Sequence, residues 1–198
     1  MKYRDDIYIY EWANYFDNNC NSYYIGGNVQ ALIDPGLTRY LPDLLNQMAN
    51  DGIKKKNIKY VINTHSHPDH FQGSELFDQE KVNIALHRKE MDFLKGIGGE
   101  LYGLFGITVP QMQINMQLED GKLELGDQVF KVISITGNSS RIKVLHRATR
   151  PHASNSRRAA SVNTPFHSCS AFAQAMASSG AHDQTGVQAP SGACVSIK

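Results

Sequence analysis

The chain has few of the residues that cross-link a protein or anchor it to a membrane. Its 198 residues include three cysteines, Cys20, Cys169 and Cys194, and this odd number at wide spacing argues against a disulfide framework. No apolar run approaches the length of a membrane span, and the polar start at residues 1–6 lacks the apolar core of a signal peptide. We therefore expect no membrane segment and take the cytoplasm as the default location.

Acidic residues are almost missing from the C-terminal part of the chain. Residues 1–140 contain 13 Lys and Arg against 18 Asp and Glu, whereas residues 141–198 contain 7 basic residues and one acid, Asp183. All nine tyrosines and the single tryptophan also precede residue 141. Composition therefore predicts a folded part, 1–140, and a basic, low-complexity tail, 141–198, that is mostly disordered. The net charge of the whole chain, +1, by itself indicates neither a nucleic-acid nor a membrane partner.

Four potential metal ligands stand within six residues, in the run His65-Ser66-His67-Pro68-Asp69-His70. The preceding residues 58–63 form a short β-branched run that favours a buried strand, and Pro68 suits the first turn of a helix. The ligands therefore lie on a strand-to-helix loop, where side chains can converge on one point. Imidazole and carboxylate suit zinc, and also manganese or iron. The plain alternative is a solvated loop, but three histidines and an aspartate at this spacing favour a metal site.

The first 140 residues alternate between strand and helix patterns. The pattern predicts a hairpin over 21–33, a helix over 41–51, a helix over 69–77, a strand over 82–86, a helix over 88–94, and paired strands at 123–125 and 129–135. Such alternation is typical of an α/β fold. His87 falls at a strand-to-helix junction and is expected to be an ordinary surface histidine. Residues 96–112 are Gly-rich and apolar, which fits either a segment that contacts substrate or a Gly-broken helical pair.

The run His-x-His-x-Asp-His, with an apolar strand before it and Phe71-Gln72-Gly73 after it, resembles the signature of the metallo-β-lactamase superfamily. The resemblance implies an αββα sandwich with one or two metal ions at the edge of the sheet. Zinc is the first candidate for this metal. The resemblance also implies that His65 and His67 hold one metal. Asp69 and His70 would help to hold the second, and Asp69 would also orient or deprotonate the attacking water. A histidine at position 67, where flavodiiron relatives carry glutamate, argues for a hydrolase-type site.

Asp34 ends an early strand, as does an aspartate that usually buttresses the metal loop in this superfamily. A simple turn aspartate is an equally good interpretation of the sequence Asp34-Pro35-Gly36.

The resemblance covers about residues 5–140 and then stops. It predicts Thr-Pro-Gly-His-Ser after strand 129–135, but the chain reads Thr136-Gly137-Asn138-Ser139-Ser140, so that Asn138 stands where a ligand histidine is expected. We expect none of the later histidines, at 146, 152, 167 and 182, to be a ligand, because none follows a β-branched run. The second half of the sandwich is therefore incomplete. A frameshift explains the break, and a genuine variant whose basic tail contacts an acidic partner is the rival explanation.

Three functions remain open on this basis. The leading hypothesis is a zinc-dependent hydrolase of the glyoxalase-II-like branch, which cleaves a small thioester or ester through a metal-activated water. A metallonuclease shares the motif, but the acidic body of this chain argues against a surface that binds phosphates. The third hypothesis is an inactive remnant that binds metal weakly, because about three of the usual ligands have no counterpart.

Overall fold

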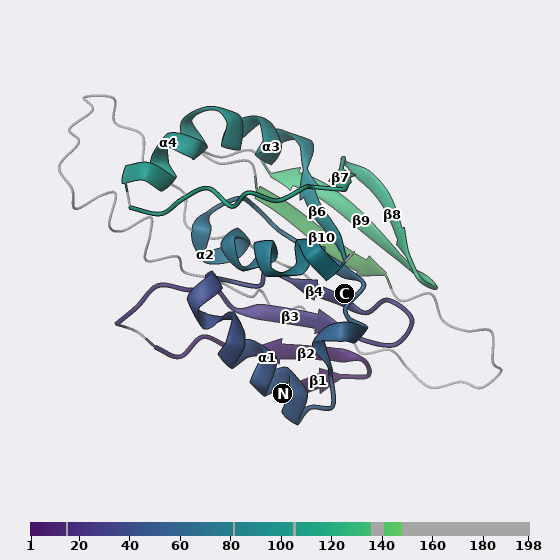
Figure 1. Cartoon of the computed structure of the whole chain (residues 1–198). Helices are drawn as coiled ribbons and strands as arrows, with labels where there is room; N and C mark the ends of the chain where they lie inside the picture. The colour runs from purple at the N-terminus through teal and green to yellow at the C-terminus, as the bar shows by residue number, and fades with distance from the viewer. Residues whose placement is uncertain (15, 81, 105, 136–140, 148–198) are drawn as a thin grey trace, which may run out of the picture.

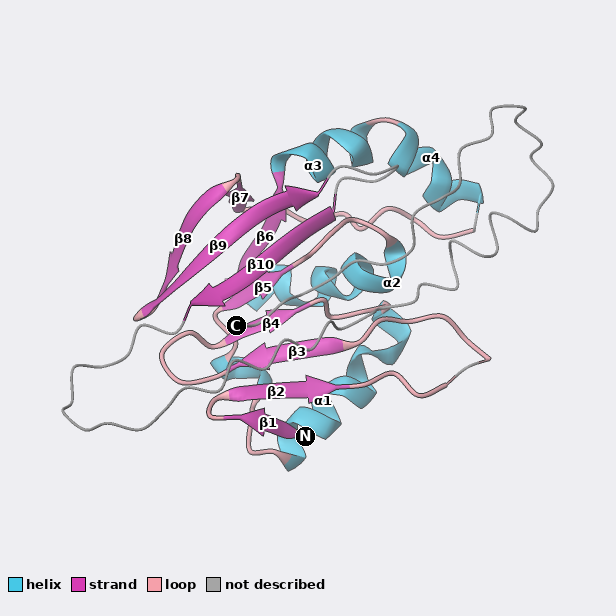
Figure 2. Ribbon diagram, turned by 180° about the vertical axis from the view of Figure 1, so that it is seen from behind, coloured by secondary structure: helices cyan, strands magenta, loops and turns pink. Residues whose placement is uncertain are grey.

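Two β-sheets lie face to face, and helices cover the outer side of the larger one (Figures 1 and 2). The computed structural model describes residues 1–14, 16–80, 82–104, 106–135 and 141–147, with the side chains of 78–80 and 141–147 left out. The larger sheet has the strand order β1-β2-β3-β4-β5-β6-β7 and the smaller one the order β10-β9-β8. The larger sheet is formed by β1 Lys2–Arg4, β2 Ile7–Tyr10, β3 Ser22–Ile25, β4 Ala31–Ile33, β5 Tyr60–Ile62, β6 Asn83–His87 and β7 Met116–Leu118. The smaller sheet is formed by β8 Gly121–Leu125, β9 Gln128–Ile135 and β10 Arg141–Arg147.

The larger sheet changes from antiparallel to parallel pairing at β4, and this change positions the site. Strands β1 to β4 pair antiparallel, whereas β4 to β7 pair parallel. Parallel neighbours need crossover connections, which here contain all the α-helices among the described residues. These are α1 Leu41–Asn50, α2 Pro68–Phe71, α3 Arg88–Lys95 and α4 Ile97–Leu104. The carboxyl ends of β4, β5 and β6 therefore meet at one edge of the sheet, where ligands bind in open α/β sheets.

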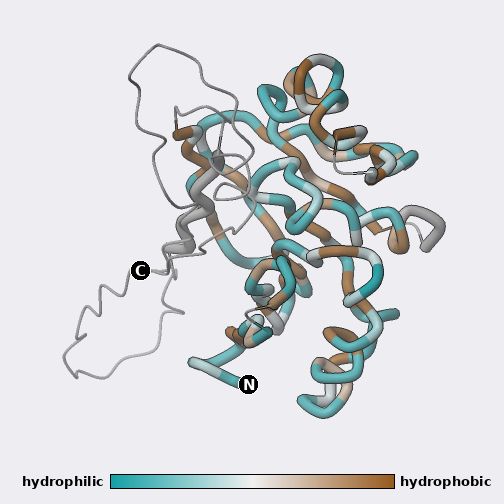
Figure 3. The backbone as a smooth tube through the Cα atoms, turned by 90° about the vertical axis from the view of Figure 1, so that its left-hand side faces the viewer, coloured by the Kyte–Doolittle hydropathy of each residue, from teal (hydrophilic) through white to brown (hydrophobic). Residues whose placement is uncertain are grey.

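Two apolar layers hold this arrangement together. One lies between the sheets, where the larger sheet contributes residues such as Ile33, Ile62 and Ala85 and the smaller sheet contributes Phe130 and Val132. The other lies between the larger sheet and its helices. It contains Leu32, Val61 and Ile84 from the strands and Leu41, Leu44 and Met48 from α1. The hydropathy colouring of Figure 3 agrees, since its brown segments run through the middle of the molecule. The alternation of core positions along β4 and β5 is therefore that of a sheet buried on both faces.

The α/β fold, the helix at 41–51 and the hairpin at 21–33 are confirmed. The predicted helix over 69–77 is not: α2 ends at Phe71, and a 3-10 helix follows over Gln72–Glu80. The reason is the amide of Gly73, which donates to the carbonyl of Gly36 at 2.6 Å. Gly73 thus lies against another loop, where a side chain would meet the carbonyl oxygen of Gly36 at 2.9 Å.

The sheet continues past the predicted boundary at residue 140. Strand β10 pairs antiparallel with β9 over its whole length, from Arg141 opposite Ile135 to Arg147 opposite Val129. The sequence interpretation missed it because the basic composition outweighed the alternation of Ile142 and Val144 with Arg141 and Lys143. Residues 148–198, and with them most of the predicted tail and any outer helical layer, lie outside the described residues. Within the described part of the chain, no helix combines the length and apolar character needed to cross a membrane.

Candidate metal centre

The four predicted ligands lie on the loop between β5 and the first turn of α2, at the carboxyl edge of the sheet. The side chains of His65, Asp69 and His70 are buried, and His67 is partly exposed. The carbonyl of His67 accepts the amides of His70 and Phe71 at 3.0 and 2.9 Å, which closes the turn that carries Asp69 and His70. The structure therefore places all four side chains at the carboxyl edge of the sheet.

The ligand side chains are close neighbours. The ring centroids of His65 and His70 are 4.1 Å apart, and those of His65 and His67 are 4.7 Å apart. The Oδ2 atom of Asp69 lies 3.7 Å from Nε2 of His70. Among the residues that the structure describes, however, no group of three or more His, Cys, Asp and Glu side chains is arranged so as to hold a metal ion. The loop thus supplies part of a ligand set.

Asp34 holds this loop from the side of β4. Its Oδ1 accepts the amide of Thr64 at 2.7 Å, and its Oδ2 accepts the Thr64 hydroxyl at 2.6 Å and contacts Nδ1 of His70 at 2.9 Å. The aspartate is buried, has a positive φ of 52°, and donates its own amide to the carbonyl of Ile62 at 3.0 Å. Asp34 therefore buttresses the metal loop. A simple turn aspartate would not account for its contacts with Thr64 and His70.

These contacts also fix the tautomers of two histidines. A carboxylate only accepts, so the contact with Asp34 places the proton of His70 on Nδ1. Thr64 gives its one hydroxyl proton to Asp34, so its contact with Nδ1 of His65, at 3.0 Å, requires that nitrogen to be the donor. In both rings Nε2 is then the nitrogen with a lone pair, which is the form that binds a metal.

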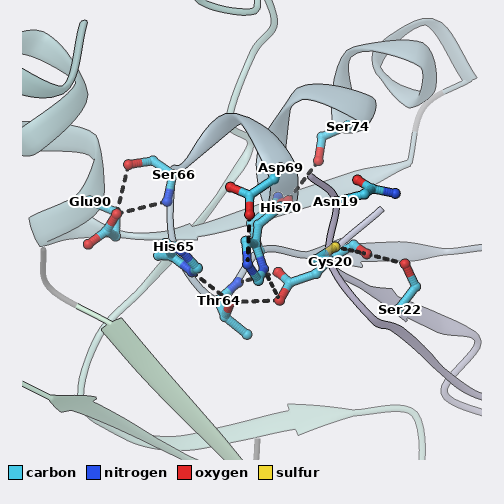
Figure 4. Close-up of polar contacts among 12 residues, drawn as sticks. Asn19, Cys20, Ser22, Thr64, His65, Ser66, Asp69, His70, Ser74 and Glu90 are labelled. Carbon is cyan, nitrogen blue, oxygen red and sulfur yellow. Dashed lines mark hydrogen bonds and ion pairs between the residues drawn. The ribbon is translucent and has the colours of Figure 1, made fainter. Parts of the chain in front are cut away.

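Ser66, between two predicted ligands, is held from the other side of the loop. Its amide and its hydroxyl donate to Oε2 of Glu90 at 2.8 and 2.7 Å (Figure 4). Its carbonyl accepts the hydroxyl of Tyr102 at 2.7 Å. Burial raises the pKa of Tyr102, and the nearby Asp69 and Glu90 carboxylates raise it further, so the phenol stays a proton donor. Sequence reasoning missed Glu90 and Tyr102. The only sequence signal for Glu90 is its place as an acidic residue in the first turn of the helix predicted after strand 82–86.

Asp69 shows whether a cation suits this site. Its carboxylate is buried, and neither oxygen accepts a hydrogen bond from the described residues. A buried carboxylate in such surroundings is costly unless a cation compensates it. Together with imidazole Nε2 atoms of fixed tautomer, it gives the nitrogen and oxygen donors that zinc takes. The donor types of these residues therefore suit a divalent metal, and the described residues supply part of its ligand set.

Cys20 lies beside this cluster but is a poor ligand. Its thiol donates to the carbonyl of Asp34 at 3.5 Å. Burial raises the pKa of the thiol, and the carboxylates of Asp34 and Asp69 raise it further. Since the thiolate is the form that binds metals, this environment keeps Cys20 protonated and structural.

His87 is not a surface histidine, contrary to the prediction. Its side chain is buried, and its Nδ1 accepts the amide of Lys89 at 3.2 Å, so that it caps the start of α3. It faces the inner side of the sheet because it ends β6 two residues after Ala85, which lies in the core between the sheets. Burial lowers the pKa of the imidazole. The side chains of the remaining candidates, Asn138 and the four later histidines, lie outside the described residues.

Comparison with known proteins agrees with this geometry. The family model of the metallo-beta-lactamase superfamily matches residues 15–143. A probable metallo-hydrolase of Methanocaldococcus jannaschii is 30% identical over 129 residues, which are 64% of this chain and 61% of that protein. The chain thus spans about three fifths of the length of this curated relative.

Solved structures show the same fold at low identity. The metallo-beta-lactamase FEZ-1 of Legionella gormanii superposes with a TM-score of 0.57 and 19% identity, over 75% of this chain and 64% of that one. The metallo-beta-lactamase GOB-18 of Elizabethkingia meningoseptica gives 0.54 and 20%, over 66% of this chain and 58% of that one. At such identities the likeness concerns the fold alone. The family model, in contrast, matches residues 15–143, a range that includes the loop from His65 to His70. This chain therefore belongs to the metallo-beta-lactamase superfamily.

Proposed function

We propose that this chain is a zinc-dependent hydrolase that cleaves a small thioester or ester, as in the glyoxalase-II-like branch of its superfamily. The proposal rests mainly on the two buried histidines His65 and His70, whose Nδ1 atoms are oriented by Thr64 at 3.0 Å and Asp34 at 2.9 Å. The buried carboxylate of Asp69 next to them, whose oxygens accept no hydrogen bond from the described residues, supports it. Iron and manganese accept the same donors, and the assay below distinguishes them by metal content.

Each residue of the loop has its own task in this scheme. A bound zinc ion supplies a Lewis acid that polarises the substrate carbonyl and lowers the pKa of water towards ~7. His65 and His67 would hold the ion through ring nitrogens, and His70 and Asp69 would help to hold a second ion. The Asp69 carboxylate would also orient or deprotonate the attacking water. Asp34 keeps His70 in the tautomer that leaves Nε2 for the metal.

The test is the metal content of purified protein, together with its hydrolysis of a thioester panel. We expect zinc to co-purify, and we expect His65→Ala to lose both zinc and hydrolysis. His152→Ala is the matched control, because it removes a histidine outside the motif, and it should keep both. Wild-type protein without zinc, or unchanged thioester hydrolysis in His65→Ala, would overturn the proposal.

A second candidate, a remnant that binds metal weakly, has an observation of its own. No group of three ligands is arranged for a metal among the described residues, and Asn138 stands where the superfamily has a histidine. Loss of one supporting group commonly costs ~10–100-fold in metal affinity. A zinc content near two per chain supports the hydrolase, whereas a small fraction supports the remnant. In the remnant, Asn138→His should raise zinc affinity.

We infer that the reading frame breaks near residue 136. The family match ends at residue 143, and residues 141–198 contain one acidic residue and no tyrosine. The nucleotide sequence tests this directly. A neighbouring frame downstream of codon 136 should encode Pro-Gly-His and a later Gly-Asp, and a gene without them would contradict the inference.

A further inference from the structure

Ser66 separates the two histidines of the loop and is fully buried. All three of its polar atoms are bound by side chains from helices that follow later in the chain. Glu90 of α3 takes the amide and the hydroxyl, and Tyr102 of α4 donates to the carbonyl. The peptide groups on both sides of Ser66, which lead to His65 and to His67, are therefore each fixed by one of these helices.

Ser66 and Thr64 are held by the same pattern of hydrogen bonds. In each case a buried carboxylate accepts both the amide and the hydroxyl of the same loop residue. Thr64 and Ser66 flank His65, so this histidine lies between two anchored residues. Asp34 directly follows β4 of the sheet, whereas Glu90 lies in the first turn of α3, and Figure 4 shows Glu90 beside Ser66.

Packing alone does not account for Glu90 and Tyr102. Glu90 has no exposed surface, and burying a carboxylate costs several kcal/mol that only specific contacts offset. Tyr102 packs against Phe71 and Leu86, a cluster in which a phenylalanine would fill the same space. Its hydroxyl adds one thing, the hydrogen bond to the loop carbonyl. The Glu90 carboxylate and the Tyr102 hydroxyl are costly to bury, and both bind the same residue, Ser66. Their contribution is therefore to fix the geometry of the loop and not to fill space in the core.

We propose that Glu90 and Tyr102 are positioning residues of the metal centre. By holding the backbone of Ser66, they set the separation of the His65 and His67 rings, whose centroids are 4.7 Å apart, and so the affinity of the loop for its metal. This inference rests on the proposed function. Without these contacts the two histidines would have to be ordered when the metal binds. The entropy lost in that ordering lowers the free energy gained on binding, so the affinity for the metal would be weaker.

Tyr102→Phe tests the proposal with the smallest possible change, the loss of one hydroxyl. The matched control is Tyr10→Phe, which also removes a hydroxyl from a buried tyrosine, here one that donates to Asp51 at 3.0 Å, away from the loop. Zinc affinity is measured by competition with a chromophoric chelator, and ligand geometry by the visible spectrum of the cobalt-substituted protein. We expect Tyr102→Phe to weaken zinc binding ~10-fold or more and to shift the cobalt spectrum. Tyr10→Phe should change neither.

Glu90 is tested by comparing a conservative variant with a disruptive one. The amide oxygen of Glu90→Gln can still accept from Ser66, whereas Glu90→Leu cannot accept at all. Zinc affinity should therefore fall in the order wild type, Glu90→Gln, Glu90→Leu. Should Glu90→Leu lack a cooperative thermal transition, Tyr102→Phe decides the question.

Two outcomes keep this inference apart from the proposed function. If His65→Ala loses zinc while Tyr102→Phe keeps wild-type affinity and an unchanged cobalt spectrum, the positioning role is wrong and the hydrolase proposal stands. If His65→Ala keeps its zinc, the proposed function itself fails, and the inference fails with it.

Discussion

The metal loop is held on two sides, and the two sides differ in origin. Before His65, Thr64 is bound by Asp34, which ends β4 and is itself tied to β5 through the carbonyl of Ile62. After His65, Ser66 is bound by Glu90 from the first turn of α3. The sheet side is built from two paired strands, whereas the helix side depends on a helix and its cap. One half of the loop is therefore anchored to the sheet, and the other half is anchored to α3 and α4.

We expect the contacts on the sheet side to contribute more to the free energy of unfolding than the contacts on the helix side. Asp34→Asn leaves only one acceptor oxygen for the Thr64 amide, the Thr64 hydroxyl and Nδ1 of His70. Removing one partner from a buried charged network costs about 3 kcal/mol or more. We therefore expect the free energy of unfolding to fall by about this amount, measured by urea denaturation of the metal-free protein.

Asp51→Asn is the control for that change. Asp51 also accepts two hydrogen bonds, from the N-terminal ammonium and from Tyr10, but its side chain is 28% exposed. Solvent should hold its cost below about 1 kcal/mol. Equal losses in the two variants would show that Asp34 is no stronger an anchor than a surface carboxylate.

The two hydroxyls allow a direct comparison of the two sides. Thr64→Val and Ser66→Ala each remove one hydrogen bond to a carboxylate, and such bonds contribute about 1.5–3 kcal/mol. Thr64→Val should cost more, because the Thr64 hydroxyl also contacts Nδ1 of His65 at 3.0 Å. Urea denaturation of both variants gives the order, and a larger loss for Ser66→Ala would reverse the comparison.

The helix side should respond to mild acid through His87. Neutral His87 caps α3 through Nδ1, and burial lowers its pKa in the folded state. A lowered histidine pKa means that the unfolded chain binds protons first, so stability falls as the pH drops below about 6.5. His87→Asn keeps a good cap without a titrating ring.

Unfolding free energies at pH 7.5 and 5.5 measure this effect. The wild type should lose more stability between these pH values than His87→Asn, by about 1 kcal/mol or less, the size of one helix cap. If both proteins lose the same amount, the cap does not titrate in this range.

Much of the fold and of the ligand loop follows from local pattern. The apolar stripe of α1, the strand before His65 and the four ligands can be predicted because each depends on residues close together in the sequence. The support of the loop cannot, because Asp34, Glu90 and Tyr102 lie 30, 24 and 36 residues from their partners. His87 was misjudged for a related reason, since its burial depends on the second sheet. The 3-10 helix after α2 escaped prediction because a distant carbonyl takes the Gly73 amide.

The contact between Gly36 and Gly73 has a consequence for exchange and for engineering. The Gly36 amide donates to the carbonyl of His70 at 3.2 Å, and the Gly73 amide donates to the carbonyl of Gly36 at 2.6 Å. These are bonds between main chains, made without any side chain, so their amide protons should exchange with solvent as slowly as those of the core strands. The backbone thus adds a third support to the loop, beside the side-chain contacts of Thr64 and Ser66. Side chains that take no part in these contacts can be exchanged to alter what the loop binds, while the backbone bonds still tie its end to Gly36.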